Sequence, residues 1–256
     1  MRGSRHAFLA GILSILSVAQ FAAVIDARIK SGTIAPASTS TTDGDPRDPG
    51  HYSDTRLETE LLRVAPTLRP EALHAALDSW GALRARGELA RPLLSVIDYS
   101  LPSTTQRLWV FDLASRRLLF HELVAHGRNS GEDLARSFSN EEGSLKSSLG
   151  AFVTGTTYFG RNGYSMRLRG MEPGVNDHAE ARTIVVHGAP YVDEAVSRKL
   201  GRLGRSHGCP ALRPGIARAL IDEIKDRTLL YAWFPSNALT LSRRHGENLS
   251  CVRGIV

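Results

Sequence analysis

The sequence has few cysteines, and this scarcity argues against a disulfide-rich small domain and against a compact cysteine metal site. Only Cys209 and Cys251 are present among 256 residues, 42 positions apart. Two cysteines cannot build the disulfide framework of a small secreted domain, and this separation matches no short metal-binding motif. One of them is therefore available for a functional role, unless the two form a single bridge. The sequence also lacks a repeat with a period of about 20 to 50 residues, which excludes solenoids and propellers.

The charge balance narrows the kinds of partner. Aromatic residues make up 7% of the chain, hydrophobic residues 42% and charged residues 23%, an ordinary balance for a globular protein with a real core. Lysine and arginine outnumber the acids by 32 to 26. This excess favours an anionic partner, such as nucleic acid, a membrane surface or a carboxylate-rich polymer. A solvated basic surface explains the excess equally well.

The first 27 residues predict export. Arg2 and Arg5 precede an apolar run over residues 7–25, the pattern of a secretory signal. Residues 1–27 form either a signal peptide that is removed after Ala27 or an anchor in the inner membrane, because a run of about 18 residues can span a bilayer. A buried N-terminal helix is the remaining alternative. We expect the protein in the periplasm or cell envelope, where nucleic acid is not its partner.

Composition divides the rest of the chain into four parts. Residues 28–53 are rich in Ser, Thr, Pro, Gly and Asp, which predicts a flexible linker. Residues 54–91 carry apolar residues at helical spacing, as in Leu73, Leu77 and Trp80, and predict helices packed on the main domain. Residues 92–240 form that main domain, and residues 241–256 form a polar tail.

The main domain reads as mostly strands. Short apolar or alternating runs predict strands over residues 93–99, 107–113, 117–124, 152–157, 164–168, 183–186 and 229–234. A helix is expected over residues 216–226, after Pro214. This order predicts a β-rich α+β fold.

Two segments carry residues suited to chemistry. A buried-type strand ends in His187-Gly188, and a glycine-rich approach leads to Ser206-His207-Gly208-Cys209. A thiolate attacks acyl carbons, an imidazole can take the thiol proton, and the backbone N–H groups of Gly208 and Cys209 can stabilise an oxyanion. The carbonyl of Gly188 can orient the base.

Other interpretations of the same residues stay open. A lone cysteine is commonly a small buried apolar side chain, and a lone histidine is commonly structural. A zinc site can also be drawn from the histidines and Cys209, namely His178, His187, His207 and Cys209. The spacing of these residues matches no compact ligand motif. We therefore expect neither a metal nor another cofactor.

These two segments resemble the active-site signature of the YkuD-type L,D-transpeptidases, and the wider sequence resembles one branch, the murein L,D-transpeptidase catalytic domain family. Further similar stretches are RLWV at 107–110, VAHG at 124–127, SFSN at 137–140, SSLG at 147–150, GVND at 174–177, GRLGRS at 201–206 and CPAL at 209–212. They extend over roughly residues 65–235. The resemblance implies a YkuD-like catalytic domain with a packed N-terminal helical segment.

The resemblance also implies roles for residues. Cys209 matches the nucleophile, His187 the general base and Gly188 the carbonyl that orients it. The substrate would be a peptidoglycan stem peptide, with Cys209 forming a thioester, releasing D-alanine and giving 3–3 cross-links. Water as acceptor would make the same site an L,D-carboxypeptidase. A murein-binding envelope protein without catalysis is the alternative of another class.

The expected substrate-binding residues are Ser206, His207, Arg205, Arg213 and Asn176. His207 matches a position that often holds tryptophan in this branch, so we expect it to line the pocket. Better-known families carry an arginine two places after the cysteine, whereas Pro210 and Ala211 follow here. A run free of acids between Glu194 and Asp222 supplies a basic rim, made of Arg198, Lys199, Arg202, Arg205, Arg213 and Arg218. Such a rim would attract the carboxylates of stem peptides.

Overall fold

The structure is a computed structural model that describes residues 55–235. The predicted signal segment 1–27, the anchor run 7–25, the linker 28–53, the tail 241–256 and Cys251 lie outside the described residues. The boundaries proposed for these segments stay predictions. No helix within residues 55–235 is long and apolar enough to cross a membrane.

Two helices precede the sheet, as the apolar spacing predicts. Helix α1 (Thr55–Val64) buries Leu57 and Leu61. Helix α2 (Pro70–Ala85) starts at Pro70, whose fixed φ suits the first helical position and whose missing N–H leaves no bond unmade there. The predicted stripe on α2 is buried, together with the small Ala72 and Ala76 beside it.

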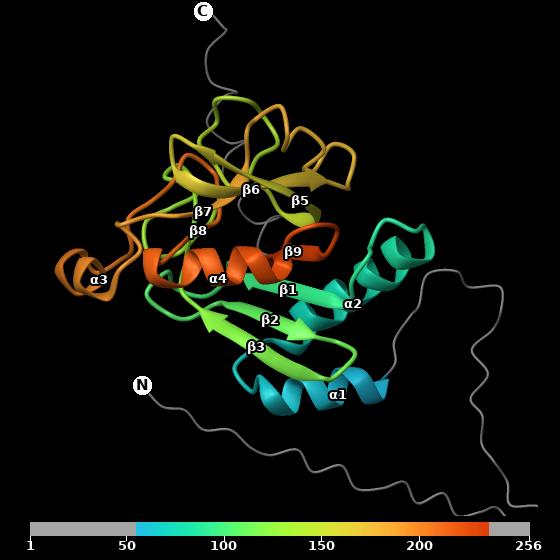
Figure 1. The fold of residues 1–256 in the computed structure, drawn as a ribbon. Coiled ribbons are helices and arrows are strands. Elements are labelled where there is room, and N and C mark those ends of the chain that lie inside the picture. The colour runs from blue at the N-terminus through green and yellow to red at the C-terminus, as the bar shows by residue number, and fades with distance from the viewer. Residues whose placement is uncertain (1–54, 236–256) are drawn as a thin grey trace, which may run out of the picture. The chain divides into compact units, whose positions relative to one another are not determined.

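The described chain forms one mixed sheet of nine strands in the order β3-β2-β1-β9-β5-β6-β7-β8-β4 (Figure 1). The strands are β1 (Leu93–Asp98), β2 (Leu108–Asp112), β3 (Arg117–Glu122), β4 (Val124–Ala125), β5 (Gly150–Gly160), β6 (Gly163–Gly170), β7 (Val185–Gly188), β8 (Ala211–Leu212) and β9 (Leu229–Trp233). The pairs β1–β9 and β7–β8 are parallel, and the other pairs are antiparallel.

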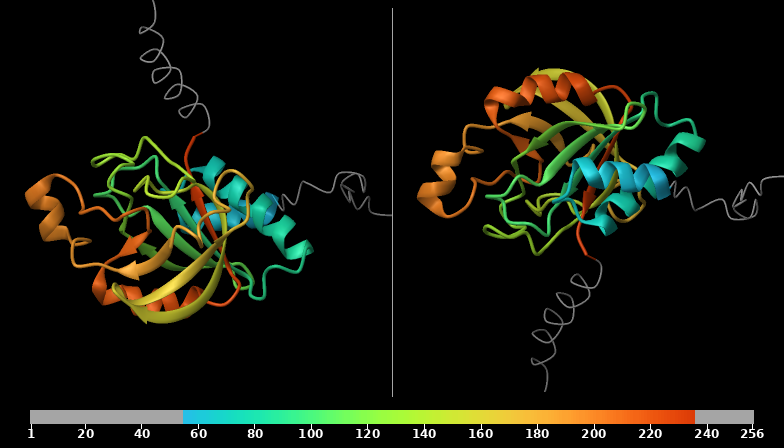
Figure 2. Two further views of the ribbon diagram at one scale, coloured as in Figure 1. Left: turned by 90° about the horizontal axis from the view of Figure 1, so that it is seen from above. Right: turned by 90° about the horizontal axis from the view of Figure 1, so that it is seen from below.

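Both faces of the sheet are covered, and the two cores follow from the alternation of side chains along each strand. On β2, Leu108 and Val110 enter one core, while Trp109 and Phe111 enter the other. Helices α1 and α2 cover the second core, and α4 (Pro214–Ile224) covers the first with Leu220 and its neighbours (Figure 2). Burial on both sides explains why the strands are apolar runs with little alternation.

The β-rich α+β prediction is confirmed, and three elements were not predicted. Strands β4 and β8 contain two residues each, too few to show any period. Helix α3 (Glu194–Leu200) buries no residue, so its sequence has no apolar stripe from which a helix could be predicted. It starts at Asp193, whose carboxylate accepts hydrogen bonds from the backbone N–H groups of Ala195 and Val196.

Candidate active site

The short parallel pair of β7 and β8 brings the two chemically suggestive segments together. His187 pairs with Ala211, and Gly188 pairs with Leu212. Strands β7 and β8 lie side by side (Figure 1). Cys209 stands two residues before Ala211 in the chain, so its turn leads directly into β8. The backbone pairing of β7 with β8 therefore brings the Cys209 turn to the end of β7, although His187 and Cys209 stand 22 positions apart in the chain.

The Cys209 turn is held from inside by Ser206. The Ser206 hydroxyl donates to the Cys209 carbonyl at 2.6 Å and accepts from the Gly208 N–H at 3.1 Å. Gly208 has φ of 126°, a conformation that side chains rarely allow. Ser206 is buried, at 4% exposure. Its side chain thus shapes the turn, and its expected contact with substrate stays a prediction.

Cys209 is a free thiol that is 7% exposed. Its Sγ lies 3.7 Å from the carbonyl oxygen of Thr183, to which the S–H can donate. Burial raises the pKa of the thiol, while hydrogen bonding from the Val185 backbone and the positive charge of Arg182 lower it. Burial is the largest of these effects, so the resting sulfur is protonated.

His187 ends β7 and is 4% exposed. Its Nδ1 lies 2.9 Å from the Gly188 carbonyl oxygen. Because a carbonyl can only accept, Nδ1 carries the proton and Nε2 keeps a lone pair for accepting one. Burial lowers the pKa of His187, which favours the neutral ring. This is the contact that the sequence led us to expect for Gly188; its catalytic use stays a prediction.

The oxyanion donor expected at Gly208 is already engaged. The Gly208 N–H is directed at Ser206 and would have to leave that hydroxyl to bind an oxyanion. The backbone N–H groups of Cys209 and Val185 are the ones that act on the sulfur itself. The oxyanion role expected of the Gly208 and Cys209 N–H groups stays a prediction.

Asn176 has a different position from the one expected. It is fully buried, its side-chain oxygen accepts from the Glu172 N–H at 2.9 Å, and its amide donates to the carbonyls of Leu149 and Ala151 at 2.8 and 2.9 Å. The two amide bonds tie the 172–176 turn to the start of β5, and the bond from the Glu172 N–H closes the turn itself. Substrate binding by Asn176 would require breaking them, so we assign the side chain to the fold.

The arginines that were expected to anchor a substrate carboxylate are paired with acids of this chain. Arg213 forms a two-pronged ion pair with Glu122, with N–O distances of 2.7 to 3.0 Å. Arg205 lies 2.7 Å from Glu132, which also pairs with Arg202 at 2.8 Å. Three of the six cations of the basic rim thus have acid partners that are distant in sequence, and Arg202 and Arg205 share one carboxylate. Substrate binding by Arg205 and Arg213 stays a prediction.

Within residues 55–235, the histidines of the zinc alternative do not assemble a metal site. His207 is exposed, and His178 lies against the carbonyl of Asn140, with Nδ1 3.2 Å from that oxygen. Over residues 55–235, no group of three or more His, Cys, Asp or Glu side chains is arranged to hold a metal ion. The zinc alternative therefore lacks a ligand set in this part of the chain.

Two buried polar side chains, Arg107 and His126, support the start of the Cys209 turn. Arg107, fully buried, donates to His126 Nδ1 at 2.8 Å and to the Val124 carbonyl. Since the guanidinium only donates, the His126 proton sits on Nε2. Burial lowers the pKa of His126 to about 4, so the ring is neutral. The His126 carbonyl accepts from the Ser206 N–H at 2.9 Å, which fixes the start of the turn.

Sequence reasoning missed one residue beside the thiol, Arg182. Its charge lowers the pKa of Cys209, and burial lowers its own pKa. It lies in a turn with no periodic pattern, five positions before His187. A lone arginine in a polar loop gives no local signal of such a position.

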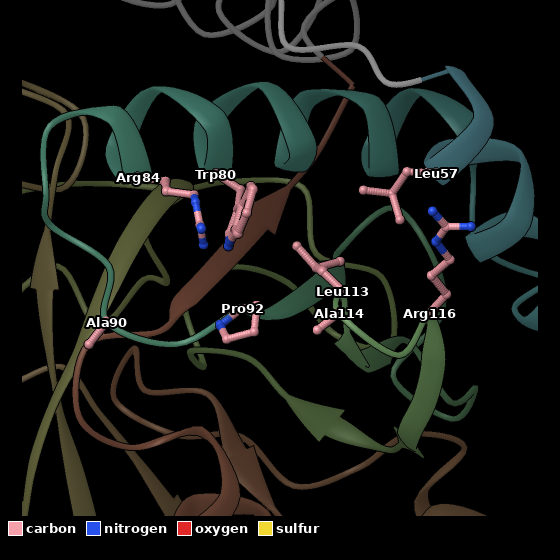
Figure 3. A pocket seen from close by; sticks show the side chains of 8 residues that line it. All are labelled: Leu57, Trp80, Arg84, Ala90, Pro92, Leu113, Ala114 and Arg116. Atoms are coloured by element: carbon pink, nitrogen blue, oxygen red, sulfur yellow. The ribbon is translucent and has the colours of Figure 1, made fainter. Parts of the chain in front are cut away.

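A separate hollow of about 500 Å³ lies between the α1–α2 pair and the β2–β3 turn (Figure 3). Both arginines that line the hollow already interact with other side chains of the protein. Arg84 lies over the Trp80 ring at 5.0 Å, and Arg116 pairs with Glu60 at 2.7 Å. The lining shares no residue with the Cys209 turn. We assign it no role in the chemistry.

Comparison with known families gives the class of this catalytic domain. The family model described as L,D-transpeptidase catalytic domain matches residues 64–233. This match covers most of the chain, including α2, the whole sheet, His187 and Cys209. The chain belongs to the L,D-transpeptidase catalytic domain family.

Solved structures with distant similarity include an L,D-transpeptidase from Mycobacterium smegmatis, at 15% identity and a TM-score of 0.34. That match covers 56% of this chain and 59% of the other. The helical cell shape determining protein Pgp2 from Campylobacter jejuni is 16% identical, with 55% and 46% covered and a TM-score of 0.37. The chain spans less than two thirds of each of these structures. No curated protein sequence matches it.

Proposed function

We propose that this protein is a cysteine-dependent murein L,D-transpeptidase that acts on tetrapeptide stems. The observation that carries the proposal is the β7–β8 pairing, which sets a buried histidine with a fixed tautomer beside the Cys209 turn. Membership of the L,D-transpeptidase catalytic domain family supports the same enzyme class. Murein is an envelope polymer, which agrees with the export expected from residues 1–27.

In the proposed first half-reaction, His187 Nε2 takes the thiol proton as the Cys209 sulfur attacks the carbonyl carbon of the third stem residue. The carbon–nitrogen bond to the terminal D-alanine breaks, and the proton passes from His187 to the departing amine. A thioester to Cys209 remains. The Cys209 amide N–H is the donor suited to the oxyanion of the tetrahedral intermediate.

In the second half-reaction, an amine of a neighbouring stem attacks the thioester carbon. His187 takes a proton from that amine, the carbon–sulfur bond breaks, and the proton returns to sulfur. The product is a 3–3 cross-link. With water as the attacking group, the same steps give an L,D-carboxypeptidase.

The pKa shifts favour proton transfer during attack over a resting ion pair. Burial raises the pKa of Cys209 and lowers the pKa of His187, so both shifts favour the neutral forms. A thiol and a neutral imidazole are therefore the resting state. The imidazole acts as a general base, which typically contributes about 10²- to 10⁴-fold to the rate.

Incubation of the protein with purified murein tetrapeptides, followed by mass spectrometry, tests the proposal. D-alanine together with peptide dimers is the expected product set. D-alanine without dimers would assign the carboxypeptidase reaction, and binding of murein without any product would assign the non-catalytic class. Cys251→Ala is the matched control, because it removes the second thiol of the chain and leaves Cys209 in place.

A further inference from the structure

Arg182 connects the segment that covers the Cys209 turn to the rest of the protein. Residues 139–148, here called the covering segment, supply four acceptors to its guanidinium. Nη1 donates to the Ser139 carbonyl at 2.6 Å and to the Ser148 hydroxyl, and Nη2 donates to the Ser144 hydroxyl at 3.1 Å and to the Lys146 carbonyl at 2.7 Å. The two terminal nitrogens carry four hydrogens, and all four are engaged.

The covering segment lies directly on the backbone of the nucleophile turn. The Ser147 hydroxyl donates to the Gly208 carbonyl at 3.0 Å. A Cβ atom built on Gly208 would stand 2.8 Å from the Lys146 carbonyl oxygen, the same oxygen that accepts from Arg182. The Lys146 carbonyl thus lies close to both the Arg182 guanidinium and Gly208, the residue before Cys209.

Arg182 differs from the other arginines near the site because no acid of residues 55–235 pairs with it. Arg205 and Arg213 are bound to Glu132 and Glu122. Arg182 is half-buried and bonded only to neutral oxygens. No negative partner within residues 55–235 offsets its positive charge, so the charge can act on neighbouring groups. A guanidinium whose terminal hydrogens are all engaged is unsuited to a two-pronged grip on a substrate carboxylate. Its charge is left to act on the sulfur nearby.

The backbone next to Arg182 is held in an unusual conformation. Thr183 has φ of 53°, which is rare for a β-branched residue. The Thr183 carbonyl is the one that lies 3.7 Å from Cys209 Sγ. Residues kept in such conformations tend to occur where the surrounding structure fixes a functional geometry.

We propose that Arg182 is a positioning residue of this site, which clamps the covering segment onto the Cys209 turn and supplies the positive charge that stabilises the Cys209 thiolate. The thiolate forms when the thiol loses its proton during attack, and it forms again as the leaving group when the thioester is resolved. The catalytic use of that thiolate rests on the proposed function, whereas the clamp and the charge do not.

The test measures alkylation of Cys209 by iodoacetamide between about pH 7 and pH 11 in the full chain, a range chosen because burial raises the pKa of the thiol. Mass spectrometry of the peptide that contains Cys209 separates its rate from that of Cys251. For Arg182→Gln we expect the midpoint of the pH–rate profile to move upward by about 1 unit, because removal of a nearby positive charge raises the pKa of a thiol by that order. Arg182→Lys keeps the charge and should keep the midpoint near that of the wild type.

The clamp is measured by limited proteolysis or hydrogen exchange of residues 139–148. Both Arg182 variants should lose protection there, because Lys cannot replace the two-nitrogen fork. Arg161→Gln, which removes an exposed arginine from the β5–β6 turn, is the matched control and should leave both readouts unchanged. A midpoint in Arg182→Gln equal to that of the wild type, or full protection of residues 139–148 in Arg182→Lys, would overturn the proposal.

If Arg182→Gln fails to fold, Arg182→Lys still tests both parts, since a shifted midpoint or an intact covering segment contradicts them. No murein is present in these measurements. Absence of turnover in the wild type would therefore refute the proposed function alone, whereas an unchanged thiol profile would refute the role of Arg182 alone.

Discussion

The Nδ1 atom of His187 lies 2.9 Å from the carbonyl oxygen of the next residue, Gly188. A backbone oxygen here does what a carboxylate does in many nucleophile–base pairs: it fixes the tautomer and the ring orientation. It brings no negative charge, so it does not raise the basicity of the ring as an acid would. Together with burial, this leaves a neutral base and predicts how the site responds to mutation and pH.

Removal of the proposed base, His187, should slow the reaction of Cys209 more than the removal of any other histidine. For His187→Ala we expect kcat/KM on murein peptides to fall by about 10²- to 10⁴-fold, the usual contribution of a general base. His74→Ala on α2 is the control and should keep wild-type kinetics.

In the wild type, the acid limb of the kcat/KM profile should lie below pH 6.5, because burial lowers the pKa of His187. A limb above pH 6.5 would contradict the neutral resting ring.

A single methyl group at Gly127 should disturb the packing over the nucleophile turn. Its Cβ would stand 2.5 Å from the Leu145 carbonyl oxygen and 2.9 Å from the Gly208 Cα. Gly127→Ala should therefore lower the free energy of unfolding by about 1 to 3 kcal/mol, as overpacking does. Gly215→Ala, in α4, meets nothing within 4 Å and should stabilise by up to about 1 kcal/mol. Urea denaturation of both variants checks this; equal effects would refute it.

The buried His126 should make stability depend on pH. Burial lowers its pKa to about 4, while the unfolded ring titrates near 6.5. Below pH 6.5 the unfolded chain binds a proton that the folded protein does not, so this contribution to stability falls as the pH drops from 6.5 to 4. The stability advantage of the wild type over His126→Gln should shrink by about 2 kcal/mol between pH 7 and pH 5. An advantage that is the same at both pH values would show that the fold does not lower the pKa of His126.

The Arg213–Glu122 pair should matter for stability and not for substrate binding. Arg213→Met leaves the Glu122 carboxylate, 10% exposed, without its partner. We expect a loss of about 2 kcal/mol, and a smaller loss in the double variant Arg213→Met/Glu122→Leu, because the unpaired charge is gone. KM for murein peptides should be unchanged in both. A raised KM in a fully folded Arg213→Met would restore this arginine as a carboxylate anchor.

Most of the fold could be predicted because its signal is local. Leu73, Leu77 and Trp80 show the helical spacing of α2, and the apolar runs mark the long strands. Strand β8, at Ala211–Leu212, could not be read from two residues, although its pairing with β7 is what places His187. The strand that matters most to the site is thus among the shortest, and so short a strand gives almost no sequence signal.

The candidate site was predictable only where a motif carries it. Cys209 and His187 stand in short signatures, whereas Arg182 meets the covering segment through oxygens that lie 34 to 43 positions away in the chain. The ion pairs of the basic rim were hidden for the same reason. Arg213 is neutralised by Glu122, 91 positions earlier, and a local count of charges cannot see that partner.

The central claim is that Cys209 carries the acyl group. The most direct test is the mass of the intact protein after brief exposure to a murein tetrapeptide, with peptide mapping of any adduct. We predict an adduct equal to the donor without its terminal D-alanine, on the peptide that contains Cys209, present in Cys251→Ala and absent in Cys209→Ala. Turnover at an unchanged rate in Cys209→Ala, or an adduct on another residue, would contradict the account.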